Sequence, residues 1–149
     1  MKRLQPILFI FSWFSLLLVS CDVEKMEKKS MDLFQGVWEL KGRTIFEDVQ
    51  IKIEKNEIGQ LKGKVVKLNN NKYVQMFVEI GDPWITEIKR RSNYEFTLSE
   101  KKIASQLFAV YGQSTTAEFK VQFIDEDTFG LGSDDENPKE TGVVYSRVR

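Results

Sequence analysis

Residues 48–54 read Asp48-Val49-Gln50-Ile51-Lys52-Ile53-Glu54 and alternate strictly between polar and β-branched side chains. Successive side chains of a β-strand point to opposite faces, so Val49, Ile51 and Ile53 share one face and the four polar residues share the other. This alternation is typical of a strand that has one buried and one solvated face. The segment therefore predicts a strand in a sheet that covers an apolar core.

Similar short segments follow along the chain, and clusters of turn-forming residues such as Asn69-Asn70-Asn71 and Gly81-Asp82-Pro83 separate them. The other predicted strands are one that begins near Gly36 and the segments Leu61–Leu68, Tyr73–Ile80, Trp84–Arg90, Tyr94–Leu98, Phe119–Phe123, Thr128–Leu131 and Gly142–Arg149. This gives eight or nine strands without the alternation of strands and helices that marks a parallel sheet. We therefore expect an all-β fold, either an antiparallel up-and-down barrel of about eight strands or a sandwich.

Residues 99–112 fit a helix better than a strand. Their apolar side chains fall on one helical face, namely Ile103, Leu107, Phe108 and Tyr111. Ser99 is suited to cap the first turn, and Gly112 is suited to end the last turn. We expect one short helix in this segment.

The composition excludes several kinds of chemistry. The 149 residues contain no His and one Cys, which rules out a Ser-His or Cys-His nucleophile pair and a thiolate zinc cluster. The 22 basic residues balance the 22 acidic ones, so nothing favours a nucleic-acid partner. We expect no cofactor, no metal site and no catalysis.

The first twenty residues have the pattern of a secretion signal. Lys2 and Arg3 form a basic head, and an apolar stretch runs from Leu4 to Val19. The stretch ends in Leu18-Val19-Ser20-Cys21, which resembles the lipobox of bacterial lipoproteins. The resemblance implies removal of residues 1–20 and attachment of lipid, such as palmitate, to Cys21. It places the protein in the cell envelope, anchored to a bacterial membrane that we expect to be the outer one.

The charged segment that begins at the cysteine, residues 21–32, shows too little apolar periodicity to pack against a core. We interpret it as a tether between the lipid and a domain that occupies residues 33–149.

The two ends of this domain resemble lipocalin-like (calycin) barrels. Gly36-Val37-Trp38 matches the Gly-x-Trp signature of that superfamily, and Tyr145-Ser146-Arg147-Val148 supplies the basic residue that packs against the tryptophan. The resemblance implies that Trp38 and Arg147 form a structural lock between the first and last strands. Small lipocalin-like envelope lipoproteins of uncharacterised activity show the same closing motif.

The inward-facing stripes are the candidate ligand-binding residues. They are Val49, Ile51 and Ile53, then Val74, Met76 and Val78, and finally Phe119, Val121 and Phe123. The alternative is that the same residues form a filled core, because a barrel of about eight strands either packs solid or holds one small ligand. Trp84 follows Asp82-Pro83, where an exposed indole would contact a ligand or a partner and a buried one would plug the barrel.

Other polar groups favour ordinary surface roles. Lys89-Arg90-Arg91 is expected to be a solvated strand end, and Ser133–Asn137 an acidic loop that lacks the spacing of a calcium site. Glu39 and Glu79 are the carboxylates that an inward orientation would make candidates for acid–base work.

The sequence is compatible with two functions. The first is a lipid-anchored barrel that binds a small apolar or amphipathic molecule. The second is an envelope interaction, scaffold or inhibitor module that acts through its loops while its core is solid.

Overall fold

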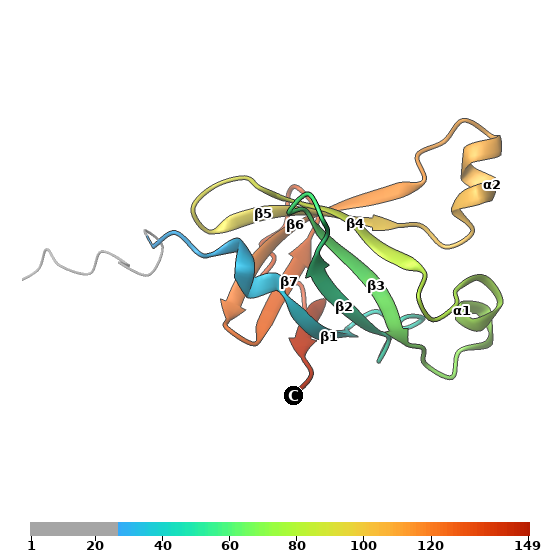
Figure 1. The fold of residues 1–149 in the computed structure, drawn as a ribbon, viewed down its shortest axis with the longest axis horizontal. Coiled ribbons are helices and arrows are strands. Elements are labelled where there is room, and N and C mark those ends of the chain that lie inside the picture. Colours follow the sequence, from blue (N-terminus) through green and yellow to red (C-terminus); the bar gives the residue numbers. More distant parts are fainter. Residues whose placement is uncertain (1–26) are drawn as a thin grey trace, which may run out of the picture.

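The computed structural model describes residues 27–149, which form a closed barrel of eight antiparallel strands (Figure 1). The strands are β1 (Gly36–Lys41), β2 (Gln50–Lys55), β3 (Leu61–Lys67), β4 (Pro83–Arg90), β5 (Glu95–Lys101), β6 (Thr116–Asp125), β7 (Thr128–Gly132) and β8 (Val144–Arg147). Each strand pairs with the next one along the chain, and β8 pairs with β1. The expected all-β up-and-down barrel is confirmed, and the sandwich is not formed.

Three short helical segments lie at the two ends of the barrel. The 3-10 turn η3 (Met31–Phe34) lies at the end where the chain enters, and α1 (Lys72–Phe77) and α2 (Ser105–Val110) lie at the opposite end (Figure 1). We call these the entry end and the helical end. Among residues 27–149, no helix has the length and apolar character needed to cross a membrane.

The chain is bound to the barrel before η3 begins. The Lys29 N–H donates to the Asn93 carbonyl at 2.9 Å, and the Arg90 guanidinium donates to the Lys29 carbonyl at 2.6 Å. The signal segment, Cys21 and the start of the tether lie outside the described residues.

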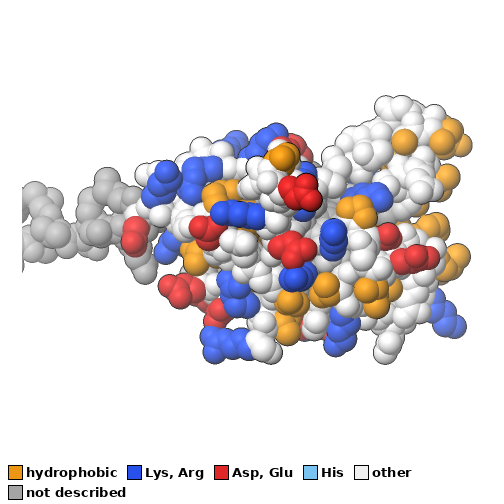
Figure 2. Space-filling view, in the orientation of Figure 1, with side chains coloured by type: hydrophobic (Ala, Val, Ile, Leu, Met, Phe, Trp, Pro, Cys, Tyr) orange, Lys and Arg blue, Asp and Glu red, His pale blue; other side chains and the backbone are white. Residues whose placement is uncertain are grey.

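The strand predicted at residues 48–54 is confirmed from Gln50 onward as β2 with one buried face, whereas Asp48 lies in the preceding turn. Val49, Ile51 and Ile53 are buried in the core, whereas Lys52 is exposed. Figure 2 shows basic and acidic side chains mixed over the visible barrel wall, as expected for the solvated face of such strands.

The strand predicted at Tyr73–Ile80 is wrong, because this segment contains α1. The Asn71 side chain caps the helix by accepting from the N–H groups of Tyr73 and Val74, at 2.9 and 3.4 Å. Val74 and Val78 are buried, and their spacing of four residues fits one helical face as well as one strand face. Met76 lies between them and is 71% exposed, so the predicted inward stripe Val74, Met76, Val78 does not exist.

The helix predicted within residues 99–112 is confirmed, but its start and its buried face are wrong. Strand β5 continues through Lys101, and α2 begins after Ala104, so Ser99 lies in a strand and caps nothing. Leu107 and Tyr111, which the pattern assigned to the buried face, are exposed. The helix projects from the barrel, so no core covers that face.

Candidate functional site

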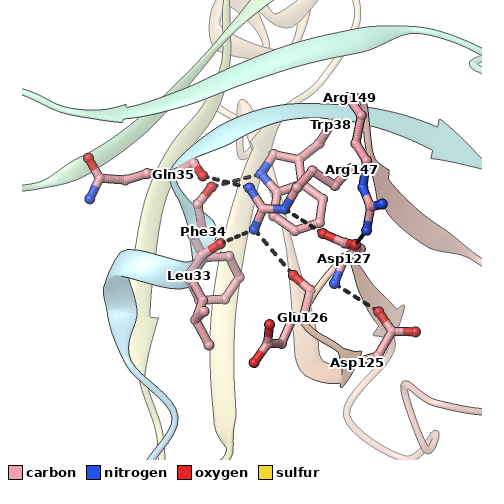
Figure 3. A network of polar contacts seen from close by, with 9 residues as sticks. All are labelled: Leu33, Phe34, Gln35, Trp38, Asp125, Glu126, Asp127, Arg147 and Arg149. Atoms are coloured by element: carbon pink, nitrogen blue, oxygen red, sulfur yellow. Dashed lines mark hydrogen bonds and ion pairs between the residues drawn. The ribbon is translucent and has the colours of Figure 1, made fainter.

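The predicted lock between Trp38 and Arg147 is present at the entry end (Figure 3). The two residues are register partners of β1 and β8, and the guanidinium carbon of Arg147 lies 4.2 Å from the indole centroid. The guanidinium also donates to the carbonyls of Gln35 and Leu33, at 2.8 and 2.7 Å, and pairs with Asp127 at 3.0 Å. We call this set of contacts the seam, because it joins the first strand, the last strand and η3.

Gly36 is required for the seam to close. Its φ of +140° lies in a region that side chains rarely adopt, and a Cβ there would lie 2.5 Å from the Arg147 guanidinium. The glycine of the Gly-x-Trp motif therefore makes room for the arginine that covers the tryptophan.

The interior next to the seam is filled by aromatic rings. Phe34 enters the barrel from η3, and its ring centroid lies 5.0 Å from Phe96, 4.7 Å from Phe123 and 5.2 Å from Phe129. The Trp38 indole lies 4.7 Å from Phe129 and donates to the Phe34 carbonyl at 2.7 Å. This half of the barrel is therefore a filled core and not a ligand pocket.

The predicted ligand-binding stripes contribute to that core. Phe119 packs partly buried against one hydrophobic cluster, and seven of the other stripe residues are buried members of it, namely Val49, Ile51, Ile53, Val74, Val78, Val121 and Phe123. Phe34 could not be predicted as a core residue, because it stands at the start of the domain and outside every predicted strand.

A buried polar network occupies the barrel toward the helical end. Trp84 Nε1 donates to the Tyr145 hydroxyl at 2.9 Å, and that hydroxyl donates to Glu100 at 2.5 Å. The other Glu100 oxygen pairs with Arg43 at 2.5 Å. The Glu100 residue is 4% exposed, so its charge is compensated inside the protein by the arginine.

Arg43 closes this network toward solvent. Its guanidinium lies over the rings of Phe46 and Phe119, at 5.4 and 4.8 Å. Because Glu100 already pairs with Arg43, an incoming ligand carboxylate would have to displace an internal one. The arrangement disfavours binding of a fatty acid inside the barrel.

Trp84 is not an exposed loop residue. It lies in β4, is 3% exposed, and its ring packs edge-on against Phe46 at 5.3 Å. The expected burial of the Trp84 indole is confirmed, but the residue lies in a strand and not in a loop that folds back.

The Tyr145 hydroxyl is expected to stay protonated for as long as the barrel is folded. Burial, and then the neighbouring Glu100 carboxylate, raise its pKa well above the ordinary value. A raised pKa means that the contribution of this group to stability is present below about pH 10, the ordinary value for tyrosine, and is lost above it as the unfolded chain ionises. The difference in absorbance between wild type and Tyr145→Phe should therefore show a phenolate signal only at the pH where circular dichroism reports unfolding. A difference signal in the folded state would contradict this expectation.

The remaining polar candidates lie on the surface. Glu39 on β1 pairs with Lys41 at 2.7 Å, and the hydrogen bond from that lysine lowers the pKa of the carboxyl group. Glu79 is exposed between α1 and β4. Within residues 27–149 no group of three or more Cys, Asp or Glu residues could hold a metal, and the acidic segment Ser133–Asn137 is an exposed loop.

The helical end carries a concentration of exposed apolar side chains (Figure 2). Seven large ones are 50–79% exposed on α1, α2 and the residues that follow them, namely Tyr73, Met76, Phe77, Ile80, Leu107, Val110 and Tyr111. We call these seven residues the apolar tip. The segment from Ile103 to Ala117 also contains no charged residue, although 30% of the chain is charged.

A shallow cleft of about 260 Å³ runs between α1 and the segment that leads into α2. Met76, Phe77, Val78 and Trp84 line one part of it, and residues 101–106 line the other. The cleft and the apolar tip are the features of the helical end that sequence analysis did not find, because α1 was predicted as a strand.

In comparisons with protein-family models, with curated proteins and with solved structures, no match to this chain was found.

Proposed function

We propose that this protein is a lipid-anchored, non-catalytic interaction module of the bacterial cell envelope, with a lipocalin-like barrel as a solid support. Its binding surface is the apolar tip, and its partner is a protein that presents an apolar groove. The lipobox-like segment ending in Cys21 supports the anchor, since two or three acyl chains hold a protein firmly to a bilayer at about 0.8 kcal/mol per buried methylene.

One observation carries the proposal, namely the seven exposed apolar side chains of the apolar tip. Apolar side chains scattered singly are normal on a monomer, whereas seven large ones gathered at one end of the barrel favour an interaction site there. Both helices lie at the helical end, so a partner with a matching groove would cover the exposed face of each (Figure 1).

A small ligand accounts for this surface less well. Pockets for small molecules usually measure about 300–1,000 Å³ and enclose most of their ligand. The cleft of about 260 Å³ is open, and its lining includes only two of the seven residues of the apolar tip. The second candidate function, binding of an amphipathic molecule, is therefore confined to this cleft and leaves most of the tip uncovered.

The chain's own tether is poorly placed to cover the apolar tip. Lys29 is bound beside Asn93 at the entry end, and the seven residues between it and Cys21 span at most about 25 Å. A second copy is also a poor occupant, because a two-fold contact between apolar tips would direct the two lipid anchors away from each other. An anchored protein would instead present the tip away from its own membrane.

Photo-crosslinking in the native envelope tests the proposal. A benzoylphenylalanine placed at Tyr111 of the full chain is expected to give one discrete product that contains another protein. The same probe at Ile58, an exposed residue on the β2–β3 turn at the entry end, serves as the matched control and should not give this product. Adding Leu107→Asp should reduce the Tyr111 product about tenfold, because a charge would be buried in an apolar contact.

Other crosslinked products would decide against a protein partner. A product with a second copy of this chain or with bilayer lipid would overturn the proposal. A product with one bound small molecule would favour the second candidate function, binding of an amphipathic molecule in the cleft, over a protein partner. A protein product of equal yield at Ile58 would show that the apolar tip confers no selectivity.

A further inference from the structure

A second groove, which is polar, lies on the outer wall of the barrel and is separate from the apolar tip. It measures about 580 Å³ and is bounded by Tyr94, by the outward side chains of β5 and β6, and by the loop between β7 and β8. Lys29 also lines it, so it opens beside the point where the chain enters the barrel.

The loop that forms one wall of the groove is held in place by several contacts. Pro138 is buried against β7, where a side chain at Gly130 would collide with the Pro138 carbonyl. Thr141 Oγ1 donates to the Leu131 carbonyl at 2.5 Å, and Asp134 pairs with Arg91 at 3.0 Å. A wall fixed in this way reduces the entropy lost when a ligand binds.

The opposite wall is also fixed. Gln122 Nε2 on β6 donates to Glu95 Oε1 on β5 at 2.9 Å, which holds an amide and a carboxylate side by side. Tyr94 stands next to this pair in the turn after β4, and the Ser92 hydroxyl accepts from its N–H at 3.3 Å. The groove thus offers an aromatic ring beside planar hydrogen-bonding groups.

The charges of the groove balance. Three lysines line it, Lys29, Lys120 and Lys139, and so do three acids, Glu95, Asp135 and Glu136. A polyanion or a polycation would find attraction and repulsion together, and an apolar molecule would leave these polar groups without partners. A neutral molecule with many hydroxyl groups meets neither difficulty.

We propose that this groove binds a carbohydrate chain. The C–H face of a sugar ring packs on the Tyr94 ring, which has an apolar body and a polar tip. The hydroxyl groups of the sugar exchange hydrogen bonds with Gln122, Glu95 and Lys120, which supply both donors and acceptors. The site lies at the entry end and is independent of the apolar tip.

Titration of the full-length protein in detergent micelles tests this site. The probes are triacetylchitotriose, maltotriose and vesicles that contain a glucosyl diacylglycerol, followed by calorimetry and by saturation-transfer NMR for the soluble sugars. At least one probe should bind, and the vesicle arm distinguishes a membrane glycolipid from a soluble glycan. Tyr94→Ala should weaken binding about tenfold, which corresponds to the loss of about 1.4 kcal/mol of aromatic contact.

A control variant tests whether sugar binding is independent of the apolar tip. Tyr73→Ala removes a more exposed tyrosine at the helical end, outside the groove, and should bind the sugar as wild type does. The proposal is overturned if none of the probes binds, or if Tyr94→Ala binds as tightly as wild type. Either result leaves the crosslinking test of the apolar tip unaffected.

Discussion

Trp38→Ala is expected to lower the free energy of unfolding by about 3–5 kcal/mol, a large part of the stability of a small domain. The substitution empties a fully buried volume between Phe34 and Phe129 and removes the hydrogen bond to the Phe34 carbonyl. It also leaves Arg147 without the indole face that it covers. Urea denaturation of the full chain in dilute detergent, followed by circular dichroism, measures the change in midpoint.

Two controls make this result specific to the seam. Ile58→Ala removes an exposed side chain and should change the free energy of unfolding by no more than about 0.5 kcal/mol. A double-mutant cycle with Arg147→Ala should give a coupling of about 0.5–2 kcal/mol, the range for a cation over an indole. A Trp38→Ala midpoint equal to that of Ile58→Ala would show that the seam contributes little.

Glu100→Leu is expected to cost about 3–5 kcal/mol of stability, although leucine is the more apolar residue. The substitution leaves the Arg43 guanidinium without its carboxylate and the Tyr145 hydroxyl without its acceptor. The loss should come mainly from the uncompensated arginine, because Trp84 still donates to the Tyr145 hydroxyl. Urea midpoints measured as for Trp38→Ala report the change.

The double variant Glu100→Leu with Arg43→Met separates charge from packing. Replacing both members of a buried ion pair by apolar residues is often neutral, so the double variant should regain most of the lost stability. If it is as unstable as Glu100→Leu alone, the cost lies in the shape of leucine at this position and the ion-pair explanation fails.

Much of the barrel could be predicted because several strands, such as β1, β2 and β3, alternate with period two, and because turn signals separate the strands along the chain. Trp38 and Arg147 could be paired in advance because the motif resemblance supplied a contact between residues that are distant in sequence. Residues 72–80 could not be assigned correctly, since a spacing of four is a multiple of two and Val74 and Val78 satisfy both patterns. The Asn71 side chain decides between them by capping the helix.

The inward orientation of Glu100 in the polar network could have been predicted from the sequence. Glu100 has the same parity as Phe96 and Leu98, whose side chains are buried, so a strand that continues to Lys101 directs Glu100 inward. The expectation that Ser99 starts a helix ended the strand too early. The partners of Glu100, Arg43 and Tyr145, lie 57 and 45 residues away along the chain, so local sequence patterns cannot predict these contacts.

The topology of the barrel has a consequence for the order in which it assembles. Seven of the eight strand pairings join neighbours along the chain, and one pairing, β1 with β8, joins segments about a hundred residues apart. Hairpins close quickly, whereas the distant pairing carries the largest loop-closure entropy and is the natural last step of folding. Contacts made after the transition state slow unfolding without speeding folding. We therefore expect the tryptophan and arginine at this junction to govern how slowly a completed barrel unfolds more than how fast it folds.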